Sequence, residues 1–177
     1  MPLTLREFTP DTQKIGAGVV VLQNGWQQKL DANKQAFMNE FVQRPRFTAA
    51  YPTSMTPAEF VDKLFATAHV SSTDSDYAAS IALFAGAADS SNVATRAQVL
   101  RRLAENSSLS RREFNRAFVL MEYFGYLRRD PNAGRDTDFS GYSFWLDKLN
   151  AFNGNFEGAE MVKAFTTSDE YRRRFPR

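Results

Sequence analysis

The 177-residue sequence has no cysteine and a single histidine, His69. The lack of cysteine excludes a disulfide framework, a thiolate zinc site and a cysteine nucleophile. The sequence also has no G-x-S-x-G motif and no glycine-rich phosphate loop, so the commonest catalytic bases and nucleophiles are missing. His69 follows a predicted helix end, where an imidazole usually interacts with free carbonyl groups. We therefore expect a non-enzymatic protein without a resident cofactor.

Long apolar runs are absent as well. No segment approaches the ~18 apolar residues needed to cross a bilayer, so we expect no membrane span. The N-terminal MPLTLREF lacks the basic and apolar regions of a signal peptide, and we expect no export signal within this chain. Apolar residues nevertheless make up 43% of the sequence and include sixteen phenylalanines, which favours a globular core over disorder.

The positive charge is concentrated in the second half. Residues 1–95 carry seven Lys and Arg against nine Asp and Glu, whereas residues 96–177 carry fifteen against eleven. An arginine-rich half could bind phosphate groups. Acidic residues are interspersed, however, and no nucleic-acid motif accompanies the arginines, so solvated helix faces are the better interpretation. We expect no nucleic-acid partner.

Hydrophobic periodicity predicts an all-α fold. Residues 110–131 read as a helix with apolar side chains on most sides, begun by a capping box of Ser110 and Glu113 and ended by Pro131. We expect this helix at the centre of a compact bundle of about six to eight short helices. Residues 1–25 read as an irregular or short-strand lead-in. Spacing and capping signals place the other helices at Trp26–Phe41, from Thr56, around Tyr77–Phe84, from about Thr95, around Tyr142–Leu149, around Met161–Phe165 and from Ser168.

The sequence matches itself at a spacing of 62 residues. We predict that residues 1–55 hold the lead-in and a partial first unit, and that residues 56–177 form a main domain of two similar units, within one compact domain. Chance helical periodicity could produce some of the matches. The corresponding positions are Phe41, Leu103 and Phe165; Phe47, Leu109 and Tyr171; Arg111-Arg112 and Arg173-Arg174; and, at twice the spacing, Tyr51-Pro52 and Phe175-Pro176.

One loop has oxygen-bearing side chains at alternating positions, as calcium loops do. It departs from the EF-hand pattern, because Arg135 stands where a glycine makes the sharp turn and Gly141 where a bidentate glutamate closes the site. Ordinary turn and capping roles are the alternative. Tryptophans and phenylalanines could likewise line a sugar or peptide groove, although their helical spacing favours core packing. The candidate metal ligands are Asp130, Asn132, Asp136 and Asp138.

Three segments of the C-terminal third carry a family likeness: YFGYLRRDP, GYSFWLDKLN and NGNFEGAEMVKAFTTSDEYRRRF. They resemble the bacterial domain-of-unknown-function family 4214. Its repeat runs from an aromatic-rich helix through an R-x-P element and a G-x-x-x-W helix to a closing A-F-x-x-S-x-E-[FY] helix. The likeness is strong over residues 115–175 and weaker over residues 37–108. The matching positions are Arg129, Pro131, Gly141, Trp145, Ala164, Phe165, Ser168, Glu170 and Tyr171.

This resemblance implies a role but no chemistry. The family is distantly similar to the helical linker domain of phycobilisomes, a scaffolding module, and its members are typically pieces of large bacterial surface or secreted proteins. It implies an extracellular interaction or spacing role, with protein partners or neighbouring domains of the same polypeptide. No catalytic residue is carried over. We expect a non-enzymatic interaction module, and the alternative is a module that binds calcium or a small ligand such as a sugar or peptide.

Overall fold

The computed structural model describes residues 3–174. These residues form ten α-helices and one π-helix and contain no β-strand, which confirms the predicted all-α class. The chain divides into two compact units. The N-terminal unit comprises Thr9–Ser110, and the C-terminal unit comprises the residues from Arg111 onward together with those up to Phe8. This division does not follow the predicted boundary after residue 55. None of the described helices is long and apolar enough to cross a bilayer.

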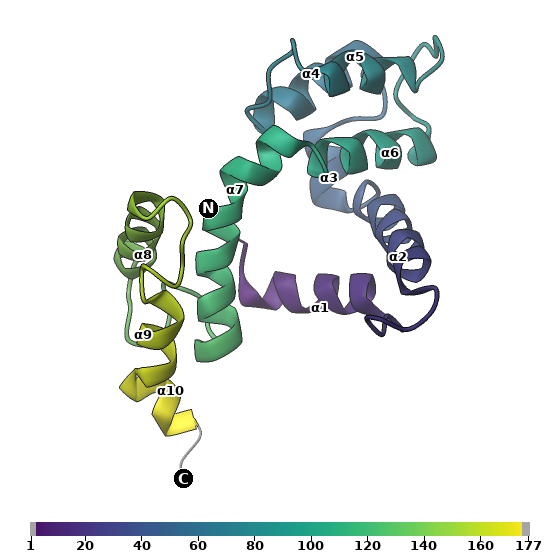
Figure 1. The fold of residues 1–177 in the computed structure, drawn as a ribbon. Coiled ribbons are helices and arrows are strands. Elements are labelled where there is room, and N and C mark those ends of the chain that lie inside the picture. The colour runs from purple at the N-terminus through teal and green to yellow at the C-terminus, as the bar shows by residue number, and fades with distance from the viewer. Residues whose placement is uncertain (1–2, 175–177) are drawn as a thin grey trace. The chain divides into compact units, whose positions relative to one another are not determined.

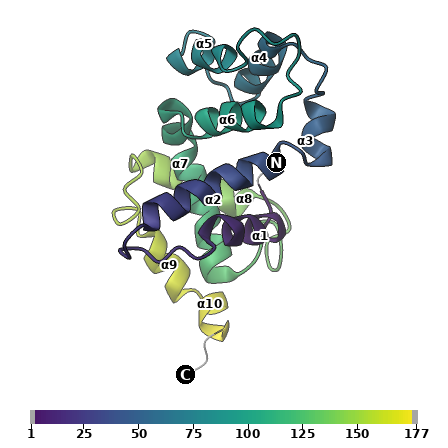
Figure 2. The same cartoon turned by 90° about the vertical axis from the view of Figure 1, so that its right-hand side faces the viewer.

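In the N-terminal unit, α6 packs between α2 on one side and the α4–α5 pair on the other (Figures 1 and 2). Its core is rich in aromatic side chains, among them Phe47, Phe60 and Phe65. The helices of this unit are the latter part of α1 (Leu5–Gly16), then α2 (Trp26–Phe41), α3 (Pro45–Ala50), α4 (Pro57–Thr67), α5 (Ser75–Ala82) and α6 (Val93–Ala104).

In the C-terminal unit, the π-helix η1 contacts both of the last two helices. Val119, Tyr123, Leu149 and Phe165 belong to its separate core. The helices of this unit are α7 (Ser107–Glu122), which begins just before the boundary, followed by η1 (Tyr123–Leu127), α8 (Ser140–Ala151), α9 (Met161–Thr167) and α10 (Asp169–Arg174).

The start of α4 confirms the predicted capping signal. The Thr56 hydroxyl accepts a hydrogen bond from the Glu59 amide at 3.3 Å, and the Glu59 carboxylate accepts one from the Thr56 amide at 2.8 Å. Pro57 occupies the first helical position, where its missing N–H costs nothing. Local sequence chemistry thus sets this helix start.

A buried cation holds the N-terminal unit together. Arg96 on α6 is 1% exposed, and its guanidinium lies 4.4 Å from the Phe60 ring centroid. It donates hydrogen bonds to the Tyr51 carbonyl at 2.5 Å and to the carbonyl and hydroxyl of Ser90 at 3.1 Å each. Burial lowers the pKa of Arg96. Carbonyl dipoles and the ring face thus take the place of a carboxylate.

The N-terminal lead-in differs from the prediction. α1 starts with a capping box, in which the Glu7 amide donates to the Thr4 hydroxyl and the Glu7 carboxylate accepts from the Thr4 amide. The following segment, residues 18–25, is irregular, but it is neither a strand nor buried. Val20, Val21 and Leu22 are 60%, 64% and 90% exposed. The prediction of an irregular or short-strand lead-in is therefore wrong for Leu5–Gly16, which is helical, whereas residues 18–25 are irregular as predicted and form no strand.

The helix expected at the centre of the fold is largely buried over residues 117–127, where only Ala117, Met121 and Gly125 are exposed. α7 begins at Ser107, because the Asn106 side chain accepts hydrogen bonds from the amides of Ser108 and Leu109 at 3.0 and 3.1 Å. The predicted start at Ser110 is wrong for that reason. Val119 is fully buried, whereas Phe114 is 57% exposed. The expected burial therefore holds for most of residues 117–127, and an exposed strip runs along the helix through Phe114, Ala117 and Met121.

Helix starts recur at the spacing found in the sequence. α3, α7 and α10 begin at Pro45, Ser107 and Asp169, 62 residues apart each time, and each follows closely on the end of another helix. The internal repeat stays a prediction, and its match between Tyr51-Pro52 and Phe175-Pro176 lies outside the described residues.

Candidate functional site

Arg129 joins the segments that carry the family resemblance. Its Nε donates to Glu170 Oε1 at 2.7 Å, and its Nη2 donates to Glu170 Oε2 at 3.0 Å and to Asp136 Oδ2 at 2.7 Å. Its Nη1 donates to the Ala133 carbonyl at 2.8 Å. Gly134 has φ 71°, and a Cβ there would lie 3.0 Å from Arg129 Cδ, so the loop needs glycine at this point. The side chain thus ties the 130–136 loop to α10.

A hollow of about 250 Å³ lies beside this network and is lined by six of the nine resemblance positions. Two of the polar side chains at its wall, those of Arg129 and Ser168, are already engaged in hydrogen bonds. Arg129 is bonded as described, while the Ser168 hydroxyl donates to the Phe165 carbonyl at 2.8 Å and accepts from the Tyr171 amide at 3.1 Å. Burial, followed by the charge of Asp136, raises the pKa of Tyr123 to about 12. This arrangement locks helices together. The six lining positions are Arg129, Gly141, Trp145, Ala164, Phe165 and Ser168.

The four predicted metal ligands do not converge on one point. Asp130 Oδ1 accepts a hydrogen bond from the Leu5 amide at 2.6 Å, Asp136 pairs with Arg129, and Asp138 Oδ1 accepts from the Ser140 amide at 2.8 Å. Asn132 is half-buried in the same loop. Within residues 3–174 there is no group of three or more acidic or histidine side chains that could hold a metal ion. Calcium binding stays a prediction, and the observed contacts are a long-range hydrogen bond, an ion pair and one local hydrogen bond.

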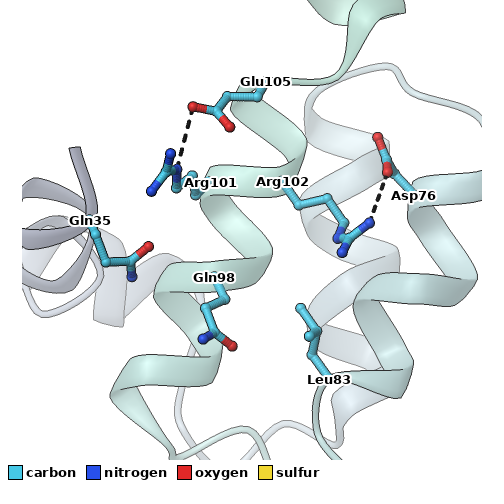
Figure 3. Close-up of a pocket in the computed structure, with 7 residues that line it drawn as sticks. All are labelled: Gln35, Asp76, Leu83, Gln98, Arg101, Arg102 and Glu105. Carbon is cyan, nitrogen blue, oxygen red and sulfur yellow. Dashed lines mark hydrogen bonds and ion pairs between the residues drawn. The ribbon is translucent and has the colours of Figure 1, made fainter. Parts of the chain in front are cut away.

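A polar hollow of about 440 Å³ lies on the N-terminal unit over α6 (Figure 3). Its charges compensate one another, because Arg102 Nη1 lies 3.2 Å from Asp76 Oδ1 and Arg101 Nε lies 3.4 Å from Glu105 Oε1. Arg101 also pairs with Asp31 on α2. These are exposed ion pairs, of the kind that typically contribute at most about 1 kcal/mol. The hollow presents no uncompensated cluster of one sign that would select a charged ligand.

Exposed apolar side chains follow one face of α7 in the C-terminal unit. Phe114, Ala117, Phe118 and Met121 are spaced i, i+3, i+4 and i+7, so they share a face. Phe114 and Met121 are 57% and 46% exposed, Ala117 is exposed and Phe118 is half-buried. Phe156, which is 37% exposed, extends the surface sideways. We call these five residues the aromatic face.

The aromatic face is ordered by ring stacking. The Phe114 and Phe118 centroids are 6.4 Å apart with planes at 27°, and the Phe118 and Phe156 centroids are 5.0 Å apart at 25°. Phe118 is thus held between two rings. Sequence reasoning assigned these phenylalanines to the core, because helical spacing alone does not show which side of a helix is covered. The only signal in the sequence was that apolar residues occur all round this helix, more than its packed side alone requires.

No protein-family model, curated protein or solved structure matches the chain. The resemblance described above therefore rests on the residues quoted for it.

Proposed function

We propose that this chain is a non-enzymatic protein-interaction module, acting as part of a longer bacterial surface or secreted protein. The aromatic face is the observation that carries the proposal. Apolar patches that stay exposed on a folded protein commonly mark interaction sites, because burying each large side chain contributes about 1.5–3 kcal/mol. Here Phe114 and Met121 on α7 and Phe156 beside them remain available for burial.

The surroundings of the face suit recognition. Its opposite side rests on a packed core through Val119 and Tyr123, and Arg129 fixes the end of the same helical run. A partner would therefore meet a preformed surface, and binding would cost little conformational entropy on this side. The paucity of catalytic groups in the sequence favours binding over catalysis, and the family resemblance favours a place in a surface or secreted protein.

Site-specific photocrosslinking tests the interaction role. We would place p-benzoylphenylalanine at Phe114 in the chain as produced by its native cells, and at Asp147, an exposed polar position on α8, as the matched control. The proposal expects a discrete crosslinked protein from position 114 and none from position 147. No adduct from position 114, or the same adducts from both positions, would overturn it.

A further inference from the structure

We infer that the aromatic face binds an amphipathic helix whose apolar stripe is flanked by acidic residues at its ends. This inference rests on the proposed interaction function and adds the chemistry of the partner. Anchors spaced i, i+3, i+4 and i+7 on one helix fit the apolar stripe of a second helix. The stacked rings of Phe114, Phe118 and Phe156 form its floor.

The charges at the ends of the face select acidic flanks. Arg111 lies one turn before Phe114, and Arg128 directly follows η1, seven residues after Met121, so the two arginines flank the face along the helical run. Both are exposed, and neither forms an ion pair with any residue between 3 and 174. The nearest acid on α7, Glu113, is engaged by Arg112 at 3.2 Å and Arg116 at 3.9 Å. Both ends of the face are thus uncompensated and positive.

Some acidic groups lie nearby but do not alter this balance. Glu122 on the same helix is buried, at 5% exposure, and does not face a docked partner. Glu157 is exposed and follows Phe156 in the chain, so it belongs to the lateral extension of the face and not to α7. A partner helix lying along α7 therefore meets arginine at each end.

A second copy of this chain fits the face poorly. Parallel pairing of two such faces would set Arg111 against Arg111, and antiparallel pairing would set Arg111 against Arg128. Both arrangements place like charges together without a compensating acid, which disfavours self-association. A lipid surface also fits poorly, because Phe118 is half-buried between two rings and cannot extend into a bilayer. An ordered face of stacked rings suits contact with the side chains of a partner helix.

Binding of two designed peptides tests the inference with the whole chain. Both are amphipathic helices of about 18 residues with the same leucine stripe, one carrying glutamates and the other lysines at its ends. By fluorescence anisotropy at low salt, the glutamate peptide should bind about 5- to 30-fold more tightly, because two exposed charge pairs change from repulsive to attractive. High salt should reduce this preference. Equal affinities, or no binding of either peptide, would overturn the acidic-helix inference.

Variants of the chain make the test specific. Phe114→Ser with Met121→Ser should abolish binding of both peptides, while a cooperative thermal melt shows that the protein still folds, since both side chains are exposed. Arg111→Glu with Arg128→Glu should reverse the peptide preference. Sedimentation that shows a dimer lost in the double serine variant would point to a second copy and overturn the inference. Binding to phosphatidylglycerol vesicles, lost in the same variant, would point to lipid and also overturn it.

The peptide experiment and the crosslinking experiment test different claims, so a negative result in one can be told apart from a negative result in the other. A protein crosslinked at Phe114 without any peptide preference would leave the interaction function standing and remove only the acidic-helix chemistry. The absence of a crosslink at Phe114 would remove the interaction function itself.

Discussion

Arg129 and Glu170, 41 residues apart in the chain, are joined by two hydrogen bonds of 2.7 and 3.0 Å. Bidentate guanidinium–carboxylate pairing is among the stronger polar contacts in proteins. The arginine lowers the pKa of the Glu170 carboxyl, which keeps it charged. Their side chains are 11% and 22% exposed, so water screens the pair only partly. This contact connects the end of η1 to α10.

Removing the cation should weaken the C-terminal unit. We expect Arg129→Met to lower the free energy of unfolding by about 2–4 kcal/mol, because two carboxylates and several carbonyls lose their donor. Arg128→Met is the matched control, since Arg128 is exposed, and it should change stability by less than about 0.5 kcal/mol. Urea denaturation measures both. Equal effects of the two substitutions would contradict the structural role of Arg129.

Gly141 has a steric reason to be glycine. A Cβ at this position would lie 2.8 Å from Tyr123 Oη, inside contact distance, and the Tyr123 ring packs edge-on against Phe165 with centroids 5.1 Å apart. We expect Gly141→Ala to cost about 1–3 kcal/mol. Tyr123→Phe removes the clashing hydroxyl and should recover most of that loss in the double variant. A thermodynamic cycle with purely additive effects would show that the two residues do not meet.

Local signals in the sequence predicted much of the fold. Thr56 and Glu59 mark the start of α4 because a capping box is formed by neighbours in the chain. The same signal at Thr4 and Glu7 marks α1, but Pro10 inside that helix obscures it. The start of α7 was missed because both Asn106 and Ser110 can cap a helix. In the structure it is the Asn106 side chain that accepts hydrogen bonds from the first helical amides. Sequence spacing does not show which of two possible N-cap residues is used.

Long-range contacts explain what sequence reasoning could not predict about the sites. The aspartates of the 130–138 loop were recognised as a group, but their oxygen atoms turn to Leu5, Arg129 and Ser140, one of them distant in the chain. The exposure of Phe114 depends on which elements fold against α7, which periodicity does not specify. The family-resemblance positions were found from the sequence, and the structure adds that they surround Arg129.

The buried guanidinium of Arg96 should not tolerate lysine. An ammonium group lacks the planar fork that reaches Tyr51 and Ser90 together, so one or more buried carbonyls would lose their hydrogen bond. We expect Arg96→Lys to lower stability by about 2–4 kcal/mol. Arg102→Lys on the same helix is the control, because that side chain is 39% exposed in a surface ion pair, and it should cost under about 0.5 kcal/mol. Chemical denaturation of both variants provides the comparison. A loss of stability at Arg96 as small as that at Arg102 would show that the guanidinium hydrogen bonds to Tyr51 and Ser90 are not needed for stability.

Glu122 should make the stability of the protein depend on pH near neutrality. Its side chain is 5% exposed, its Oε2 has no hydrogen-bond partner among residues 3–174, and burial raises its pKa to about 7. Because this acid binds its proton more tightly in the folded state, its contribution is complete below the unfolded pKa of about 4.5. That contribution is lost as the pH rises to 7 and beyond.

Glu122→Gln should remove this loss. At pH 8 we expect the variant to be more stable than the parent by about 1–3 kcal/mol, and at pH 4 the two should be nearly equal, because a protonated glutamate resembles glutamine. Glu113→Gln is the control on the same helix: its carboxylate is 42% exposed and paired with arginine, so the substitution should be neutral or slightly destabilising at pH 8. Thermal melts across this pH range distinguish the two. A destabilised Glu122→Gln variant at pH 8 would show that the buried carboxylate is charged and paired in the folded protein.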